Sequence, residues 1–421
     1  MRVAYPDVPT SGVRPEAAPH AYPHLEMSRT RRALSTAGLS GAAAALAAAG
    51  GATWYYARRI TEPPVDAKPL PVPAEDRVHV LGAATEARTL DLRGVDAHRR
   101  GRWGVSWGDG YAQVGRVLHR DGEVATRELL SSWGTPPGAD TEALFEAYAY
   151  PERPDALDLP VEEVSFSSPV GDVPAWLYPA EGPTWAIFVH GRSAAKHEAL
   201  RAVPTAHARG MPCLTISYRN DREAPRSPDG HSHLGATEWE DVEAAVVYAL
   251  SRGARDLVLV GYSMGGSLVV NFLRVSPKVD RVRGVVLEAP VLDWGPVLRR
   301  AAEARGLPHA VLPVLLPATM AVARMHTGID FRAMRHLDAS NDLRHRTLLI
   351  HGDADEIVPV ELADSLAAAR PDLITYLRVP GAGHVRSWNV DPEAYEAALG
   401  TYLDDVLTGP MPRRRRHPRR T

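Results

Sequence analysis

A serine between two glycines is the residue of this sequence with the clearest chemical potential. Residues 261–265 read Gly-Tyr-Ser-Met-Gly, a G-x-S-x-G pattern centred on Ser263. An apolar run over 256–260 precedes the pattern, and a helix-forming run over 266–273 follows it. The first run predicts a buried parallel strand, so Ser263 should lie on a sharp turn between a strand and a helix. Such a turn exposes the hydroxyl and predicts a serine nucleophile.

A serine hydroxyl is a weak nucleophile and needs a positioned base, which in turn needs an orienting group. His384 follows the apolar run 373–379, and Asp355 follows the apolar run 347–351. Ser263, Asp355 and His384 therefore each stand just past the C-terminal end of a predicted strand. Open parallel sheets hold their sites at that edge. We predict a catalytic triad of these three residues.

Other polar residues compete for these roles. Asp353 is the nearest alternative acid, but we interpret it as a turn-forming residue. Glu288 ends a predicted strand and is the second choice for the acid. His190 is interpreted as a structural residue of a His-Gly turn.

The segment 161–407 resembles the α/β-hydrolase fold superfamily. The family's order of nucleophile, acid and histidine is reproduced here. The resemblance implies a mostly parallel central sheet with helices on both faces. The matching motifs lie at residues 190–193, 261–266, 351–359 and 381–384.

The resemblance also implies how the site is completed. It assigns the oxyanion hole to the backbone N–H groups of Arg192 and Met264. The Arg192 side chain is then either structural and solvated or in contact with an anionic group of the substrate. The nucleophile elbow around the serine consists of Gly261, Tyr262 and Gly265.

These residues lead us to expect a serine hydrolase that cleaves a carboxylic ester-type bond through an acyl-enzyme. The expected substrate is a small acyl compound or a short peptide, and no cofactor is needed. A lipase and a serine peptidase of the oligopeptidase kind remain alternatives. A catalytically inactive, membrane-anchored scaffold is the alternative from a different class.

Strand-like and helix-like runs alternate through the second half of the chain, which favours an α/β fold. A proline-broken apolar stretch within 294–336 interrupts the alternation, and we interpret it as a helical lid. Plain core or a membrane-contacting surface is the alternative reading. We expect a hairpin over 161–178, then strands near 185–190, 212–218, 256–261, 284–289, 347–351 and 373–379. The expected helices cover 198–209, 238–251, 264–275, 360–369 and 392–407.

The N-terminal region suggests a membrane. No charged residue occurs from 33 to 57, a stretch long enough to cross a bilayer as a helix. An uncleaved single-pass anchor in the cell membrane, in contact with lipid, is the preferred reading. The alternatives are a cleaved export signal of the twin-arginine kind, with Arg31 and Arg32, and a soluble alanine-rich helix. Met27 is a candidate for the true start.

The expected organisation has six parts. They are a disordered N-terminus (1–32), the anchor or export signal (33–57), a Pro-rich linker (58–73), a small β-rich region (74–160), the α/β-hydrolase domain (161–408) and a basic disordered tail (409–421).

The composition limits the classes of protein to which this chain can belong. The chain has 421 residues, of which 45% are hydrophobic and 24% charged, as in globular proteins. A net charge of −3 gives no general affinity for nucleic acid. Cys213 is the one cysteine and lies in a predicted core strand, so we expect it to be inert. We expect no metal site in the polar loop that holds Asp229, His231 and His233, because nothing completes a ligand shell.

Overall fold

The structure is a computed structural model, and it describes residues 50–67, 74–84 and 86–411. The chain divides into two compact units, Met1–Ala52 and Thr53–Thr421. The second unit holds all of the described residues except 50–52. The predicted disordered N-terminus (1–32) and residues 412–421 of the predicted basic tail lie outside the described residues.

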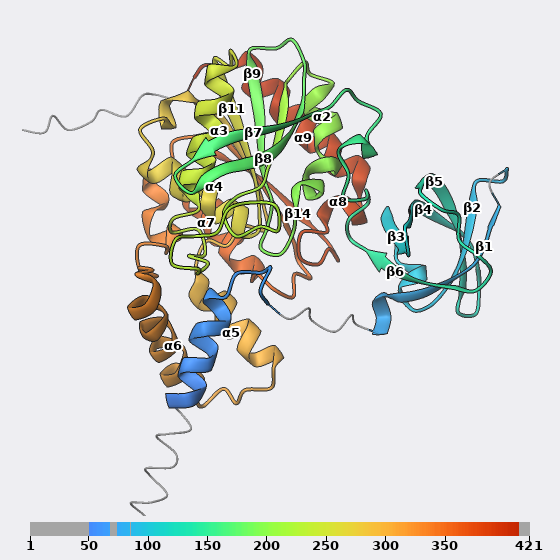
Figure 1. Ribbon diagram of the computed structural model, residues 1–421, viewed down its shortest axis with the longest axis horizontal. Helices are drawn as coiled ribbons and strands as arrows, with labels where there is room; N and C mark the ends of the chain where they lie inside the picture. The colour runs from blue at the N-terminus through green and yellow to red at the C-terminus, as the bar shows by residue number, and fades with distance from the viewer. Residues whose placement is uncertain (1–49, 68–73, 85, 412–421) are drawn as a thin grey trace, which may run out of the picture. The chain divides into compact units, whose positions relative to one another are not determined.

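An eight-stranded sheet forms the centre of the C-terminal part (Figure 1). Its strands are β7 (Glu162–Ser168), β8 (Gly171–Tyr178), β9 (Thr184–Val189), β10 (Cys213–Ile216), β11 (Asp256–Tyr262), β12 (Val282–Glu288), β13 (Thr347–Gly352) and β14 (Ile374–Val379). The order across the sheet is β14-β13-β12-β11-β9-β10-β8-β7. Strands β9 to β14 run parallel, whereas β8 is antiparallel to both of its neighbours. The predicted, mostly parallel sheet is therefore confirmed.

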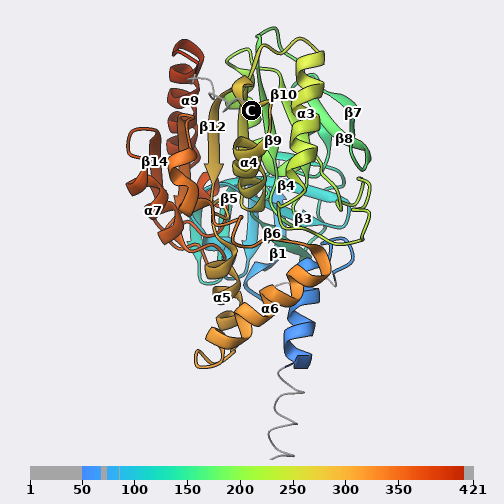
Figure 2. The same cartoon turned by 90° about the vertical axis from the view of Figure 1, so that its left-hand side faces the viewer.

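Helices cover both faces of this sheet, as predicted. The helices of this part are α2 (Val203–His207), α3 (Trp239–Ser251), α4 (Met264–Val275), α5 (Trp294–Ala304), α6 (Leu312–Thr327), α7 (Val360–Ala369), α8 (Ser387–Val390) and α9 (Pro392–Thr408), of which α5 and α6 project beyond the end of the sheet (Figure 1). Successive side chains of a strand point to opposite faces. Ile187 of β9 accordingly packs in the core with α3, α4 and α7, whereas Phe188 packs in the core with α2 and α9. Figure 2 shows α4 in front of the strands, with α3 beside it.

A closed barrel of six strands precedes the sheet. Its strands are β1 (Arg77–Ala84), β2 (Thr89–Arg93), β3 (Trp103–Trp107), β4 (Gly110–Asp121), β5 (Val124–Trp133) and β6 (Thr141–Glu146). The order is β1-β2-β5-β4-β3-β6, and the pairing of β1 with β6 closes the barrel. Val78, Leu92, Val105 and Phe145 are among the side chains of its separate core. This barrel is the predicted N-terminal β-rich region.

Hydrogen bonds from one buried asparagine of α8 join the barrel to the part of the chain that holds the eight-stranded sheet. The Asn389 side-chain amide donates to the carbonyl oxygens of Arg102 and Ala147, at 2.8 Å each. The backbone N–H of Arg102 donates to the carbonyl oxygen of Asn389 at 2.8 Å. A Cβ at Gly101 would lie 1.8 Å from that carbonyl oxygen, so this close contact requires glycine. The barrel is therefore attached by backbone and amide hydrogen bonds, which form only when their donors and acceptors lie in these positions.

Short 3₁₀ helices complete the described structure. They are η1 (Ala74–Asp76), η2 (Asp96–His98), η3 (Pro154–Ala156), η4 (Lys196–Arg201), η5 (Val279–Arg281) and η6 (His336–Asp342). The predicted helix over 198–209 is thus divided into η4 and α2. The predicted lid stretch 294–336 contains α5 and α6, but its role as a lid stays a prediction.

The predicted anchor over 33–57 lies mostly outside the described residues. Its last part belongs to a helix over 50–61, which continues past residue 58, where we expected the linker to begin. The Thr61 hydroxyl donates to the carbonyl oxygen of Ala57 at 3.0 Å, within the last turn of this helix. Among the residues that the structure describes, no helix has the length and apolar character to span a membrane.

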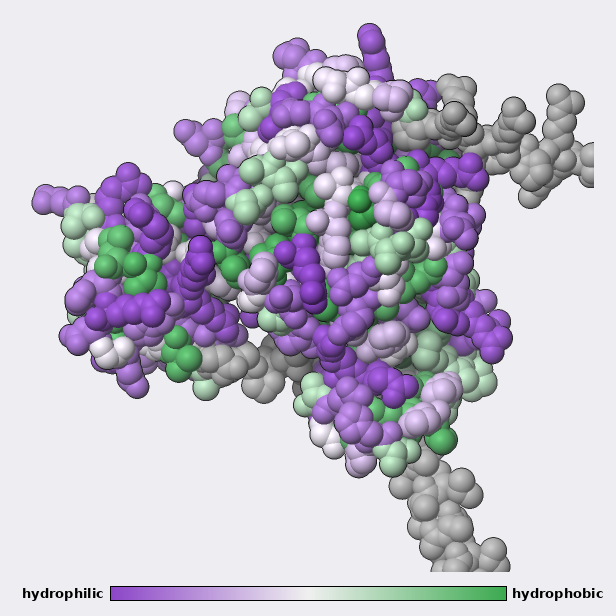
Figure 3. Space-filling view, turned by 180° about the vertical axis from the view of Figure 1, so that it is seen from behind, coloured by the Kyte–Doolittle hydropathy of each residue, from purple (hydrophilic) through white to green (hydrophobic). Residues whose placement is uncertain are grey.

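The surface of the described part is largely hydrophilic on the face seen in Figure 3, with hydrophobic residues in small separate groups. The larger exposed apolar side chains include Trp54 and Tyr55, together with Val314 and Met325 of α6. The Trp54 ring meets the His326 ring edge-on at 4.3 Å. Trp54 therefore contacts α6.

Candidate active site

Ser263 lies on the sharp turn between β11 and α4, with φ of +51° and ψ of −116°. A non-glycine residue at positive φ is strained, and the surroundings must hold it there. The backbone N–H of Ser263 donates to the carbonyl oxygen of Glu288 in β12 at 2.9 Å. A Cβ at Gly265 would lie 2.2 Å from the carbonyl oxygen of Val189, so α4 can begin this close to β9 only with glycine. The predicted elbow geometry is present.

Three side chains predicted to act together form one hydrogen-bonded chain. His384 Nε2 lies 2.8 Å from the Ser263 hydroxyl, and His384 Nδ1 lies 2.8 Å from Oδ2 of Asp355. An ionised carboxylate only accepts hydrogen bonds, so Nδ1 carries the proton and Nε2 is free to accept the serine proton. The structure thus brings together the three residues in the order a triad needs. Their catalytic roles stay a prediction.

The Asp355 carboxylate is held by donors on both oxygens. Oδ1 accepts the backbone N–H groups of Ile357 and Val358, at 2.8 Å each. Oδ2 accepts a second imidazole, His351 Nε2, at 3.0 Å in addition to His384. Burial opposes ionisation, but the hydrogen bonds from His351 and His384 outweigh it and hold the pKa of Asp355 well below its usual value. The acid is therefore ionised and fixed in orientation.

Two backbone amides next to Ser263 match the expected oxyanion hole. The residue before Arg192 is Gly191, where a Cβ would lie 3.1 Å from the Cβ of Ser263. This places the turn after β9 directly beside the nucleophile. Met264 is the first residue of α4, so its N–H has no acceptor within the helix. Among the described residues, the structure records no acceptor for the N–H groups of Arg192 and Met264, as a hole for developing negative charge requires.

A buried arginine, which was not predicted from the sequence, connects three segments of the site. The Arg201 guanidinium lies 3.9 Å from Glu198 and 3.8 Å from Glu288. Its Nη1 donates to the carbonyl oxygen of Val385, next to His384, at 2.9 Å. Glu198 in turn accepts the backbone N–H of Gly191 at 2.7 Å. One cluster of buried charges thus links the turn after β9, the end of β12 and the loop that holds His384.

Two competing acids are placed elsewhere. Asp353 accepts the backbone N–H of Gly381 at 2.7 Å, in keeping with a turn-forming role. Glu288 is fully buried and accepts the Tyr395 hydroxyl at 3.1 Å. Neither carboxylate is bonded to the His384 ring.

The remaining predicted site residues have structural partners. His190 Nε2 lies 2.9 Å from Asp221, and its ring stacks on Tyr218 with 4.5 Å between centroids. Burial opposes the charged form of His190, but Asp221 outweighs this and raises the pKa of the imidazole. The Arg192 guanidinium donates to the carbonyl oxygen of Glu62 at 2.7 Å, so this side chain fixes the segment after the N-terminal helix.

A second serine–histidine pair lies one turn further along α4. The Ser267 hydroxyl lies 3.1 Å from His336 Nε2, and both side chains are buried. Burial, followed by the charge of Arg274, lowers the pKa of His336 to about 3. Arg274 Nη1 lies 3.3 Å from the other ring nitrogen of His336, where a triad would place a carboxylate. This pair is therefore a structural one.

We expected no metal site in the polar loop over 229–233, and two side chains of this loop bond to each other. His233 Nε2 lies 3.0 Å from Asp229. Within the part of the chain that the structure describes, no group of three or more His, Cys, Asp or Glu side chains is arranged to hold a metal ion.

Family models match the two parts of the described chain separately. A model described as the alpha/beta hydrolase family matches residues 186–398, just over half of the chain. A model described as a domain of unknown function (DUF8805) matches residues 77–146, which run from the first residue of β1 to the last of β6. A comparison with curated proteins found no match.

Several solved structures are similar to this chain. The esterase Pf2001 of Pyrococcus furiosus is 17% identical with a TM-score of 0.49, and the match covers 61% of this chain and 94% of the esterase. A putative aryl esterase from Burkholderia cenocepacia is 19% identical with a TM-score of 0.43, covering 59% of this chain and 100% of that one. A thermophilic esterase from Thermogutta terrifontis is 19% identical with a TM-score of 0.42, with the same coverage of 59% and 100%.

Proposed function

We propose that this chain, which belongs to the alpha/beta hydrolase family, hydrolyses carboxylic esters with Ser263 as the nucleophile. Family membership makes it a hydrolase, in agreement with the expectation from sequence. The observation that supports the proposed chemistry is the hydrogen-bonded chain from Ser263 through His384 to Asp355, with 2.8 Å at both steps.

The proposed reaction proceeds through an acyl-enzyme. His384 Nε2 accepts the Ser263 proton while the serine oxygen attacks the ester carbonyl. The N–H groups of Arg192 and Met264 hold the negative oxygen of the tetrahedral intermediate. The C–O bond to the alcohol then breaks, and His384 gives its proton to the departing oxygen.

Hydrolysis of the acyl-enzyme repeats the same steps with water. His384 accepts a proton from water, the resulting hydroxide attacks the acyl carbon, and the proton returns to Ser263. Asp355 stabilises the positively charged imidazole in both halves of the reaction. No other residue needs to change its protonation state.

A fluorophosphonate probe tests this proposal, because it labels only an activated serine. Wild-type protein should be labelled, and Ser263→Ala should lose the label together with about a millionfold of kcat on p-nitrophenyl acetate. Ser267→Ala is the matched control, since Ser267 also contacts a histidine and lies on the same helix. Labelling that survives in Ser263→Ala, or that is lost only in Ser267→Ala, would contradict the proposal.

The location of the enzyme is a separate proposal that rests on sequence. Residues 33–57 would anchor the chain in the cell membrane or direct its export. Membrane fractionation of the full chain, compared with a chain that starts at residue 58, tests it. Recovery of both chains in the soluble fraction, with no export, would contradict both readings.

A further inference from the structure

Helix α6 presents an apolar face to solvent. The exposed residues of this face recur at intervals of three or four: Val311, Val314, Pro317, Ala321 and Met325. Val314 and Met325 are each 76% exposed. The buried residues of the helix lie on its opposite side. A helix on the surface of a soluble protein normally carries charged residues on its outer face, so the uncharged face of α6 is typical of a docking surface.

Two aromatic residues extend this surface. Trp54 is 49% exposed and Tyr55 is 58% exposed, and both belong to the helical segment 53–61. The Trp54 ring lies 4.3 Å from the ring of His326 near the end of α6, so the aromatic residues and the apolar face are neighbours. Tryptophan and tyrosine are enriched where a protein meets the boundary between lipid and water.

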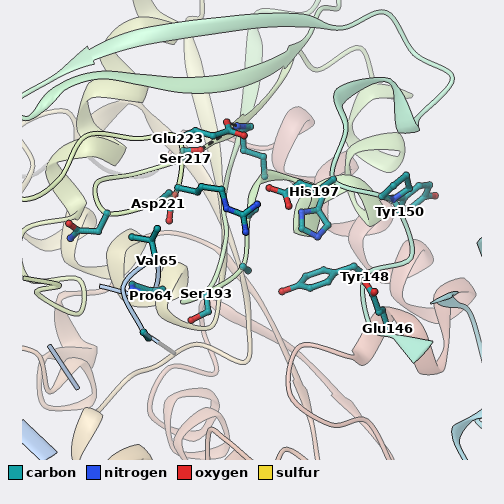
Figure 4. A pocket seen from close by; sticks show the side chains of 18 of the residues that line it. Pro64, Val65, Glu146, Tyr148, Tyr150, Ser193, His197, Ser217, Asp221 and Glu223 are labelled. Atoms are coloured by element: carbon teal, nitrogen blue, oxygen red, sulfur yellow. Dashed lines mark hydrogen bonds and ion pairs between the residues drawn. The ribbon is translucent and has the colours of Figure 1, made fainter. Parts of the chain in front are cut away.

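The segment that carries these aromatic residues is fixed to the body of the protein. Ala57 is buried in the core beneath α3 and α4. The carbonyl oxygen of Thr61 accepts the backbone N–H of Ser232 at 2.8 Å. Figure 4 shows Pro64 and Val65, a few residues later, beside a cavity of about 540 Å³ that they help to line. The two aromatic side chains are therefore held beside α6 by a segment with several contacts of its own.

The same part of the molecule is basic. Residues 53–62 and 294–330, which include the aromatic segment, α5 and α6, hold six arginines and three acidic residues, in a chain whose net charge is −3. Arg58, Arg299 and Arg305 are exposed, and the structure records no ion-pair partner for them among the residues it describes. This part therefore carries positive charge that its own acidic residues do not neutralise.

Apolar side chains, interfacial aromatic residues and arginines together match an anionic lipid surface. Arginine side chains can extend their charged ends to lipid headgroups while the apolar side chains enter the boundary of the acyl chains. The 16 residues of α6 are fewer than the about 20 that a spanning helix needs, so α6 suits a position along the surface. A second copy of the chain would present the same positive charge and repel the first, which argues against a dimer through this face.

We propose that α6, together with Trp54 and Tyr55, docks the folded protein onto the surface of an anionic lipid bilayer. Val314 and Met325 enter the boundary between headgroups and acyl chains, and the exposed arginines contact lipid phosphates. The contact is formed by folded residues that the structure describes. It therefore requires neither the proposed ester hydrolysis nor the proposed membrane anchor.

A fluorescent label on α6 tests the proposal. Val314→Cys in the full chain provides one exposed thiol, because the native Cys213 is buried and should not react. The label is a nitrobenzoxadiazole dye, whose emission rises in an apolar medium and is quenched by nitroxide groups on lipid acyl chains. Vesicles of phosphatidylcholine with about 30% phosphatidylglycerol supply the anionic surface.

Val247→Cys is the matched control, since Val247 is an exposed valine of α3, which lies beside the strands of the sheet (Figure 2). Nitroxide lipid should quench the label at position 314 at least about fivefold more than the label at position 247. Quenching at position 314 should be weaker with phosphatidylcholine alone, and weaker again in about 1 M salt, where charges are screened beyond about 3 Å.

The outcomes distinguish lipid docking from its alternatives. Quenching at position 314 without quenching at position 247 supports docking on lipid. Equal quenching at both positions, or none at position 314, overturns the proposal, whether or not the chain sediments with the vesicles. Emission at position 314 that rises with protein concentration in the absence of lipid overturns it in favour of a second copy on this face. The fluorophosphonate probe measures the activity of Ser263 separately, so the proposed function is not affected by these results.

Discussion

The Asp355 carboxylate links the chemistry of the site to its response to acid. Its pKa in the folded protein is lowered, against the cost of burial, by His351 and His384. A group with a lowered pKa stabilises the fold above its unfolded pKa and loses that contribution as the pH falls toward its folded pKa. The contribution of Asp355 is therefore complete at neutral pH and declines below about pH 4.

We predict that Asp355→Asn reduces this acid sensitivity. Between about pH 6 and pH 3, the free energy of unfolding of the wild type should decrease by about 1 kcal/mol more than that of the variant. Urea unfolding at both pH values measures the difference. Asp353→Asn, in the same turn but exposed, should retain the wild-type loss. An equal loss in wild type and Asp355→Asn would show that the hydrogen bonds to Asp355 do not contribute.

Site residues can be predicted from the sequence when their neighbours along the chain mark them. Ser263 is identified by its flanking glycines, and Asp355 and His384 by their places after apolar runs. Residues that contribute through contacts with distant parts of the sequence were not predicted. Arg201 and Glu288 meet only because η4 and β12 lie near each other in the fold, and no spacing within the sequence encodes that contact.

The arrangement of elements around the site depends on a cluster of buried charges at η4, and within it on a single arginine. Arg201 is buried between Glu198 and Glu288, which are buried as well. Removal of one partner of a buried ionic cluster leaves the other charges without compensation. The same change would release the carbonyl oxygen of Val385 in the histidine loop.

We predict that Arg201→Met lowers the free energy of unfolding by about 3–5 kcal/mol. Arg209→Met is the control, since Arg209 pairs with the exposed Asp404 at 2.8 Å and should cost at most about 1 kcal/mol. Urea unfolding of both variants makes the comparison. Equal stability of the two variants would contradict a structural role of the buried cluster.

Strands of the central sheet could be predicted because burial on both faces of the sheet gives them unbroken apolar runs in the sequence. All seven residues of β11 are buried, and the run 256–261 marks it in the sequence. The barrel strands were not resolved from sequence, because their pairing depends on register. Within β4 and β5 the pairing shifts several times, and no turn signal reveals such irregularities.

For the molecule as a whole, the attachment of the barrel depends on Asn389. Both hydrogens of its amide are directed at carbonyl oxygens on the barrel side. An aspartate at this position would turn two favourable contacts into repulsion between oxygens, in a fully buried place.

We predict that Asn389→Asp weakens this attachment by at least about 2 kcal/mol while the catalytic fold persists. Hydrogen exchange at residues 101–102 and 147–149 should become faster. Asn271→Asp is the matched control, because that amide donates to the carbonyl oxygen of Gly235, at 3.0 Å, within the catalytic part. Unchanged exchange in Asn389→Asp would show that other contacts hold the barrel.

The single cysteine has a consequence for where such a protein can fold. Cys213 is buried in β10, and burial raises the pKa of its thiol. The chain can form no internal disulfide, and the folded protein offers no accessible thiol to oxidants, glutathione or another chain. The folded structure therefore does not depend on the formation or reduction of a disulfide within this chain.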